Sequence, residues 1–289
     1  MLGKLLKYDL KSTLKLFLIG AIISPVAAIG GGVMLRLFFG IVESNSESIV
    51  LNLFAVFCMI SGFVCLLLVG LFFFFTQILV YVRYYKNFFT DEGYLTFTLP
   101  ASRGALFFSK TVSATIYFVA QTVISVLSFL LFAIVVTPAE RGAFPLNFDV
   151  LAGIGQLLSE LWSLCGAWTL VYILEVLLIG LAVLVYSTML VYFCITVGSI
   201  LVKRAKLLLS IGIYYAFNSI LSTLSQLAIF LFGVFTVEGV TILSEGMTKN
   251  QACATFALLF LLILAAVSAV AALLYSLTQT LLDRKLNLA

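Results

Sequence analysis

The sequence predicts an all-α, polytopic membrane protein with six transmembrane helices, an N-terminal amphipathic interfacial helix and both termini in the cytoplasm. Three observations support this: an apolar composition, six long apolar runs, and basic residues that cluster between alternate runs. Hydrophobic residues make up 63% of the chain and charged residues only 10%, whereas soluble domains carry about 25% charged residues. A single transmembrane domain over residues 1–289 is therefore expected, because six crossings leave no room for a soluble domain.

Each apolar run is long enough for a helical crossing, which needs about 20 residues. We expect the spans at roughly 16–39, 49–82, 106–136, 168–202, 207–235 and 252–281. The second run exceeds what a bilayer requires, so its helix either tilts or extends into the cytoplasm. Residues 137–164 are expected to lie on the outer side. They would form an outer loop over 137–149 and an interfacial or re-entrant helix over 150–164.

Lysine and arginine concentrate on one predicted side of the membrane. Thirteen of the sixteen basic residues fall in the expected cytoplasmic segments: Lys4, Lys7, Lys11, Lys15, Arg83, Lys86, Arg103, Lys110, Lys203, Arg204, Lys206, Arg284 and Lys285. Only Arg36, Arg141 and Lys249 lie toward the outside. Because basic loops stay in the cytoplasm, this asymmetry predicts that both termini are inside.

The first fifteen residues have the pattern of an amphipathic helix. Its polar face carries Lys4, Lys7, Lys11 and Lys15, and its apolar face carries Leu2, Leu5, Leu6 and Leu10. Such a helix lies in the membrane interface with its lysines reaching anionic lipid headgroups. Asp9 interrupts the apolar face and is expected to meet another cytoplasmic element. The alternative is a helix that only anchors the first span. A cleavable signal peptide is disfavoured because the apolar run that follows is too long.

Residues 83–104 form the longest polar segment between two spans, and their basic residues place them in the cytoplasm. The segment is too aromatic for a simple connector, since it contains Tyr84, Tyr85, Phe88, Phe89, Tyr94 and Phe97. Asp91, Glu92 and Gly93 have the composition of a helix cap or turn. We interpret this central loop as a docking surface for a partner protein.

Glu175 is the one acidic residue deep within an apolar run. A carboxylate inside the membrane is a candidate proton or substrate site. Counting about 1.5 Å per residue back from Lys203 places it about 40 Å away, near the outer boundary. An acid that reaches outer water or a neighbouring helix is therefore an equally good interpretation.

Several chemistries are missing from the sequence. The chain has no histidine, which excludes HExxH zinc sites and nucleophilic sites based on histidine. It has no GxxxxGK[ST] loop to bind ATP.

The five cysteines of the chain lie in or beside apolar runs without a CxxC pair, which is typical of packed helices rather than metal sites. The net charge is only +4, and the basic residues lie mostly on the predicted cytoplasmic side of the membrane rather than in one patch that could bind nucleic acid. We expect no catalytic, cofactor or metal site, and a role as the membrane part of a larger assembly.

Two stretches resemble a known family. The opening MLGKLLKYDLKST, and the fragment RYYKNFFTDEGYLTFTLPASR with the start of the third span, are similar to six-span permease subunits of bacterial ATP-binding-cassette exporters, particularly those of Gram-positive Firmicutes. The resemblance covers about the first 120 residues and the number of spans, and the later spans match by hydropathy alone. One difference is that the amphipathic outer stretch lies at 150–164 rather than between the last two spans.

The resemblance implies a location in the bacterial cytoplasmic membrane and a specific set of partners. The expected partners are a nucleotide-binding ATPase subunit, which binds the ATP, a second permease copy or sister permease, and membrane lipids. The central loop would hold the coupling helix that docks on the ATPase subunit. The residues at the matching positions are Phe88, Phe89, Asp91, Glu92, Gly93, Tyr94 and Pro100.

The function implied is export of a substrate that the apolar spans suggest is amphipathic, such as a peptide or a lipid. Two other classes stay open. One is a membrane component that captures the substrate of an uptake system, for which Asn218, Gln226 and Glu175 are the available polar residues. The other is a scaffold or sensor that does not transport and whose central loop binds a signalling partner.

Overall fold

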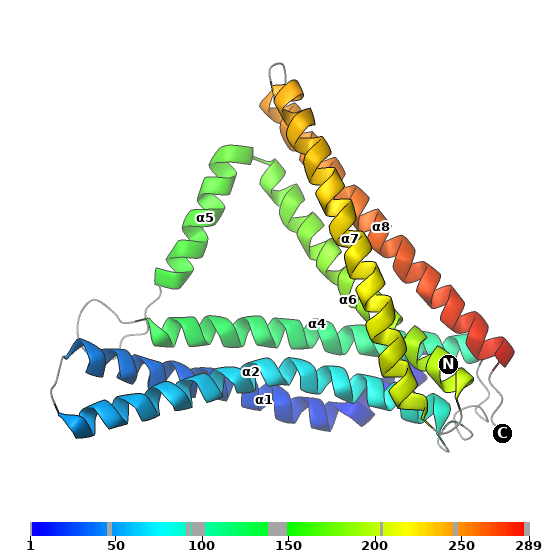
Figure 1. Ribbon diagram of the computed structural model, residues 1–289, viewed down its shortest axis with the longest axis horizontal. Coiled ribbons are helices and arrows are strands. Elements are labelled where there is room, and N and C mark those ends of the chain that lie inside the picture. Colours follow the sequence, from blue (N-terminus) through cyan, green and yellow to red (C-terminus); the bar gives the residue numbers. More distant parts are fainter. Residues whose placement is uncertain are drawn as a thin grey trace. The chain divides into compact units, whose positions relative to one another are not determined.

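The computed structural model describes residues 2–44, 48–90, 93, 102–137, 149–202, 205–244 and 248–285. Within these ranges the chain is all-α, with seven helices and no strand. The helices are α1 (Leu2–Glu43), α2 (Ile49–Phe89), α4 (Arg103–Val136), α5 (Asp149–Cys165), α6 (Trp168–Leu201), α7 (Lys206–Ser244) and α8 (Lys249–Lys285), as Figure 1 shows.

Six of the described helices are long and apolar enough to cross a membrane, and α5 is the shorter one. The prediction of an all-α protein with six membrane-length helices is therefore confirmed for the described part of the chain. The sidedness of the termini and the interfacial position of residues 1–15 stay predictions. The outer loop predicted over 137–149 lies outside the described residues except for Thr137 and Asp149, and Asp149 is the first residue of α5.

Five of the six membrane-length helices are longer than the apolar runs that predicted them, and α6 matches its run to within one residue. α1 is continuous from Leu2, so the expected interfacial helix and the first span form one helix of 42 residues. α2 continues to Phe89, in agreement with the alternative in which it extends beyond the bilayer. The reason is local: residues 76–89 contain no Gly or Pro. A helix continues until a residue that favours a turn interrupts it.

The chain divides into two compact units. The first contains Met1–Val82 and Val112–Glu160, and the second contains Arg83–Thr111 and Leu161–Ala289. α2 thus passes from the first unit to the second after Val82, and α4 returns after Thr111. Both flanks of the central loop consequently belong to the same unit as α6, α7 and α8.

In the first unit α1 packs closely on α2 and α4, and the three helices run alongside one another (Figure 1). A Cβ added at Gly31 would lie 2.9 Å from the Cβ of Cys65 on α2, and one at Gly32 would lie 2.9 Å from the Cβ of Val135 on α4. The Ser24 hydroxyl also donates to the Ser128 hydroxyl of α4 at 3.0 Å. Small residues that permit close backbone approach, together with hydroxyl bonds, are typical of membrane helix packing.

In the second unit α6 packs against both α7 and α8. Gly198 of α6 has the backbone of Ser210 within 3 Å of where a Cβ would stand, which brings α6 and α7 into direct contact. At the other end of α6 the Tyr172 hydroxyl donates to the Cys253 carbonyl of α8 at 2.9 Å. These two contacts hold α6 between its neighbours at both of its ends.

Candidate functional site

The extension of α2 beyond Val82 places aromatic side chains inside the second unit. Tyr84 and Phe88 are one helical turn apart, so they share a face of α2. Both are buried, with exposed fractions of 1% and 0%. The Tyr84 ring stacks on Tyr192 of α6 with centroids 3.8 Å apart and an interplanar angle of 12°. The last turns of α2 are therefore packed directly on α6.

A hydrogen bond accompanies this stacking. The Tyr84 hydroxyl lies 2.8 Å from Oγ1 of Thr196 in a buried position. Thr196 is one turn beyond Tyr192, whose carbonyl accepts the Thr196 hydroxyl at 2.7 Å. A tyrosine hydroxyl that is buried among apolar groups needs such a partner, because an unsatisfied hydroxyl is costly to bury.

Phe107 connects the same residues to α8. It is fully buried at the start of α4, with its ring centroid 6.3 Å from those of Tyr84 and Tyr192 and 4.9 Å from that of Tyr275. We call Tyr84, Phe88, Phe107, Tyr192 and Tyr275 the aromatic cluster. Each aromatic pair stabilises packing by about 0.5–1.5 kcal/mol beyond its buried area. The cluster thus joins α2, α4, α6 and α8 where the central loop begins and ends.

Two basic side chains hold the backbone at the ends of the central loop. Nζ of Lys206 on α7 donates to the Phe89 carbonyl at 3.4 Å, a long bond. The Arg103 guanidinium donates to the carbonyls of Leu282 and Asp283 at 3.0 and 3.2 Å. These are among the last carbonyls of α8, which have no partner within the helix and carry partial negative charge. The loop ends are therefore bound to α7 and α8 through main-chain groups.

The predicted coupling residues occupy different environments. Phe88 is buried in the aromatic cluster, whereas Phe89 is partly buried and its ring contacts Tyr84 and Tyr85. Gly93 is buried, and its N–H donates to the Thr90 carbonyl at 2.8 Å. Phe88 would thus anchor the loop rather than form its outer surface. The other predicted residues, Asp91, Glu92, Tyr94 and Pro100, lie outside the described residues.

The N-terminal turns of α1 keep the polar and apolar faces that the sequence predicts. Its four lysines, Lys4, Lys7, Lys11 and Lys15, are all exposed. On the predicted apolar face, Leu5, Leu6 and Leu10 are only partly exposed, whereas Leu2 is exposed. Asp9 is also partly buried, and its carbonyl accepts the Ser12 and Thr13 hydroxyls. The Leu10 carbonyl accepts the Tyr117 hydroxyl of α4, which fixes this part of α1 within the first unit.

Glu175 lies on α6, far along the helix from the aromatic cluster. Its side chain is 5% exposed, and Oε2 finds no hydrogen-bond partner among the described residues. It is one turn beyond Tyr172, the residue that bonds to α8. The structure therefore places this carboxylate against protein rather than on an open surface.

The sequence interpretation missed Phe107, Tyr192, Thr196 and Tyr275. They sit in spans whose neighbours are equally apolar, so hydropathy does not distinguish them. One signal was available: Tyr192 and Thr196 are one turn apart on the same helix face, a spacing that would have paired them as a polar patch. Nothing local in the sequence pairs them with Tyr84.

No group of three or more Cys, Asp or Glu side chains in the described residues could hold a metal ion. The site is an aromatic and hydrogen-bonded anchor for the two ends of the central loop. Comparisons with protein-family models, with curated proteins and with solved structures find no match to this chain.

Proposed function

We propose that this chain is the membrane-spanning permease subunit of an ATP-binding-cassette transporter in the bacterial cytoplasmic membrane. It would export an amphipathic substrate with ATP that a separate subunit hydrolyses. The observation that supports this best is the anchoring of both ends of the central loop to α6, α7 and α8. A loop with firmly held ends suits the transmission of force to membrane helices.

The proposed mechanism is a rigid-body movement. Closure of two ATPase subunits would push the central loop, and Tyr84 and Phe107 would carry that push to α6 and α8. Packed aromatic side chains deform little, so a displacement at one end reaches the other rather than being absorbed. The interfacial helix at residues 1–15 would move with the lipid surface.

One chain of six spans encloses little space, so the transporter would contain two permeases, as a homodimer or with a sister chain. Alternating movement of two such bundles around a shared path is a common transport geometry. The absence of a GxxxxGK[ST] loop in the sequence agrees with an ATPase on a separate chain.

The experiment is affinity purification of the full chain from its own cells in nanodiscs, with mass spectrometry of the proteins that accompany it. We expect a nucleotide-binding subunit with the unmodified chain, and its loss with the double variant Asp91→Ala/Glu92→Ala. The matched control is Glu238→Ala/Glu245→Ala, which removes the same charge from the predicted outer side and should retain the subunit.

Two outcomes would contradict the proposed function, and a third would contradict only its docking residues. Recovery of the chain alone, or with a partner that lacks a Walker A loop, would favour the scaffold or sensor class. Specific binding of a small metabolite by the chain would favour the capture class. Equal retention of the ATPase subunit by both double variants would exclude Asp91 and Glu92 as the docking residues.

A further inference from the structure

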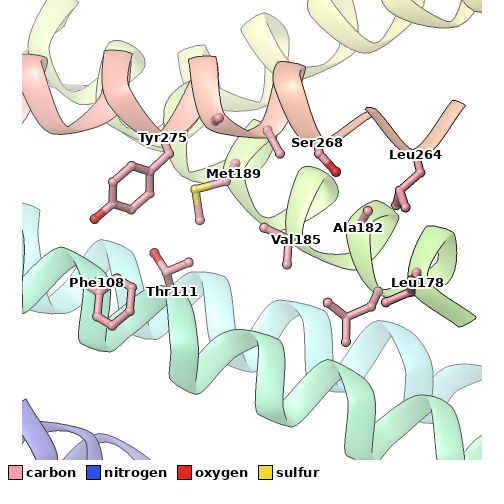
Figure 2. Close-up of a pocket in the computed structure, with 12 residues that line it drawn as sticks. Phe108, Thr111, Leu178, Ala182, Val185, Met189, Leu264, Ser268 and Tyr275 are labelled. Carbon is pink, nitrogen blue, oxygen red and sulfur yellow. The ribbon is translucent and has the colours of Figure 1, made fainter. Parts of the chain in front are cut away.

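The second unit contains a cavity of about 660 Å³. All its lining residues belong to this unit and come from α4, α6 and α8. Figure 2 shows Phe108 and Thr111 of α4 opposite Met189 of α6 and Tyr275 of α8. The volume lies within the range of about 300–1,000 Å³ that is typical of small-ligand sites.

The cavity exists because small side chains face one another across α6 and α8. Ala182 of α6 lines it together with Ser268, Ala271 and Ala272 of α8. α8 is held to α6 on one side of this stretch by the Tyr172 hydrogen bond to the Cys253 carbonyl, and to α4 on the other side by the contact between Tyr275 and Phe107.

The lining has no charged group and offers three side-chain hydroxyls, on Thr111, Ser268 and Tyr275. The Thr111 hydroxyl already donates to the Phe107 carbonyl at 3.0 Å. A bound water needs two to four polar partners, which this lining does not bring together at one point. An empty gap would forfeit the dispersion contacts of its walls. Phe108 and Leu181 are about half exposed, at 48% and 49%, so the cavity is open on one side, and in a membrane that side would be reached by lipid hydrocarbon.

The two ends of the cavity differ. Tyr275 and Thr111 lie at one end in Figure 2, and Leu178 and Leu264 lie at the other. Thr111 follows Arg103 by eight residues, which corresponds to about 12 Å along α4. Tyr275 precedes Asp283 by the same number. Thr111 and Tyr275 are therefore at the end nearer to the central loop, and Leu178 and Leu264 are at the end farther from it.

We propose that this cavity binds one fatty-acyl chain of a membrane lipid, with the polar end of the lipid toward Tyr275 and the end of the chain between Leu178 and Leu264. The inference deepens the proposed function and rests on it for one point, that the bound lipid is the cargo. It selects a lipid over an amphipathic peptide, because the walls offer only three hydroxyls, which are too few to satisfy the N–H and C=O groups of an extended peptide.

The test uses the full chain in nanodiscs that contain a phospholipid with a diazirine in the middle of one acyl chain. After illumination, labelled peptides are identified by mass spectrometry. We expect the label to concentrate on the cavity faces of α6 and α8, at Val185, Met189 and Ser268. Ala272→Phe places a ring in the cavity and should reduce this labelling about tenfold, the factor that corresponds to 1.4 kcal/mol of binding free energy.

The matched control is Ala266→Phe, which adds the same ring two positions from Ser268 and so about 200° around α8. It should leave the labelling unchanged. If Ala272→Phe does not yield folded protein, Ala182→Phe fills the cavity from α6 instead.

Uniform labelling around the helices, or equal labelling of the filled and control variants, would overturn the inference. Preferential labelling of the cavity by a photoreactive amphipathic peptide rather than the lipid would also overturn it. The experiment includes no ATPase subunit, so its failure would leave the purification result, and with it the proposed function, unaffected.

Discussion

Tyr84 donates its hydroxyl proton to Thr196, across 112 residues of sequence. The direction follows from proton counting, because Thr196 has one O–H and that group already donates to the Tyr192 carbonyl. The Thr196 oxygen therefore accepts the hydrogen bond from Tyr84, while the Thr196 hydroxyl donates its own hydrogen bond within α6. The arrangement joins the end of α2 to α6 at a point next to the stacked rings of Tyr84 and Tyr192.

Tyr84→Phe should lower the free energy of unfolding by about 0.5–1.5 kcal/mol, since it removes one hydrogen bond and keeps the ring. Tyr84→Ala should cost about 3–5 kcal/mol, because the stacked ring is lost as well. A double-mutant cycle with Thr196→Val, followed by thermal unfolding in detergent, isolates the coupling between the two residues. Tyr215→Phe, at a tyrosine that is 68% exposed on α7, is the control. Additive effects of Tyr84→Phe and Thr196→Val would contradict the bond.

The three consecutive glycines of α1 are expected to differ in their tolerance of a methyl group. Gly31→Ala and Gly32→Ala should each cost about 1–3 kcal/mol by overpacking, since their Cβ atoms would meet neighbouring atoms at 2.9 Å. Gly30→Ala has open space at its Cβ and should stabilise the helix by up to about 1 kcal/mol. Thermal unfolding of the three variants compares them in one sequence context. A loss of stability in Gly30→Ala equal to the other two would refute this packing.

Gln121 of α4 is expected to be a source of instability. The side chain is 1% exposed, and neither its oxygen nor its nitrogen has a hydrogen-bond partner in the described part of the chain. Gln121→Leu should therefore raise the free energy of unfolding by about 1–3 kcal/mol, the cost of a buried unsatisfied group. Gln156→Leu, at an exposed position of α5, should change it by less than about 0.5 kcal/mol. Destabilisation by Gln121→Leu would show instead that the amide binds a polar partner.

Arg103 should stabilise the final turns of α8. Arg103→Ala removes both bonds to the Leu282 and Asp283 carbonyls, and a loss of about 1 kcal/mol corresponds to a roughly fivefold larger population of the open state. Hydrogen exchange of peptides that cover 278–285 measures this opening. Arg103→Lys should only partly restore protection, because an ammonium group lacks the planar fork that reaches two carbonyls. Lys86→Ala, at an exposed basic residue, is the control and should leave exchange in α8 unchanged.

The sequence predicts the length and polarity of the membrane helices, but it does not predict which face of each helix contacts its neighbours. Apolar runs locate the six membrane-length helices because a bilayer imposes the same demand on every crossing. They do not mark helix ends: α2 reaches Phe89 because its continuation depends on backbone hydrogen bonds and the absence of turn residues rather than on hydropathy. α6 is apolar around its whole circumference, so its sequence has no period to show which face meets α8.

Contacts between residues far apart in the chain also could not be predicted from the sequence. Tyr192 and Phe107 have the same apolar neighbours as many residues of the other spans, so hydropathy does not distinguish them, and nothing local in the sequence pairs either of them with Tyr84. The cavity depends on the coincidence of Ala182 with Ser268 and Ala272 on another helix. An alanine indicates a cavity only when the residue opposite it on the neighbouring helix is known to be small as well. The sequence does not show which residues lie opposite one another, so it could not predict this cavity.

Tyr275 belongs both to the aromatic cluster and to the cavity wall. A lipophilic compound lodged beside it would press on Phe107, and through that ring on the segment that the proposed function assigns to docking an ATPase subunit. In the proposed transporter, such a compound would reduce ATP turnover without reaching the nucleotide or entering the cytoplasm. Its potency would then depend on how much of it partitions into the membrane rather than on its aqueous concentration.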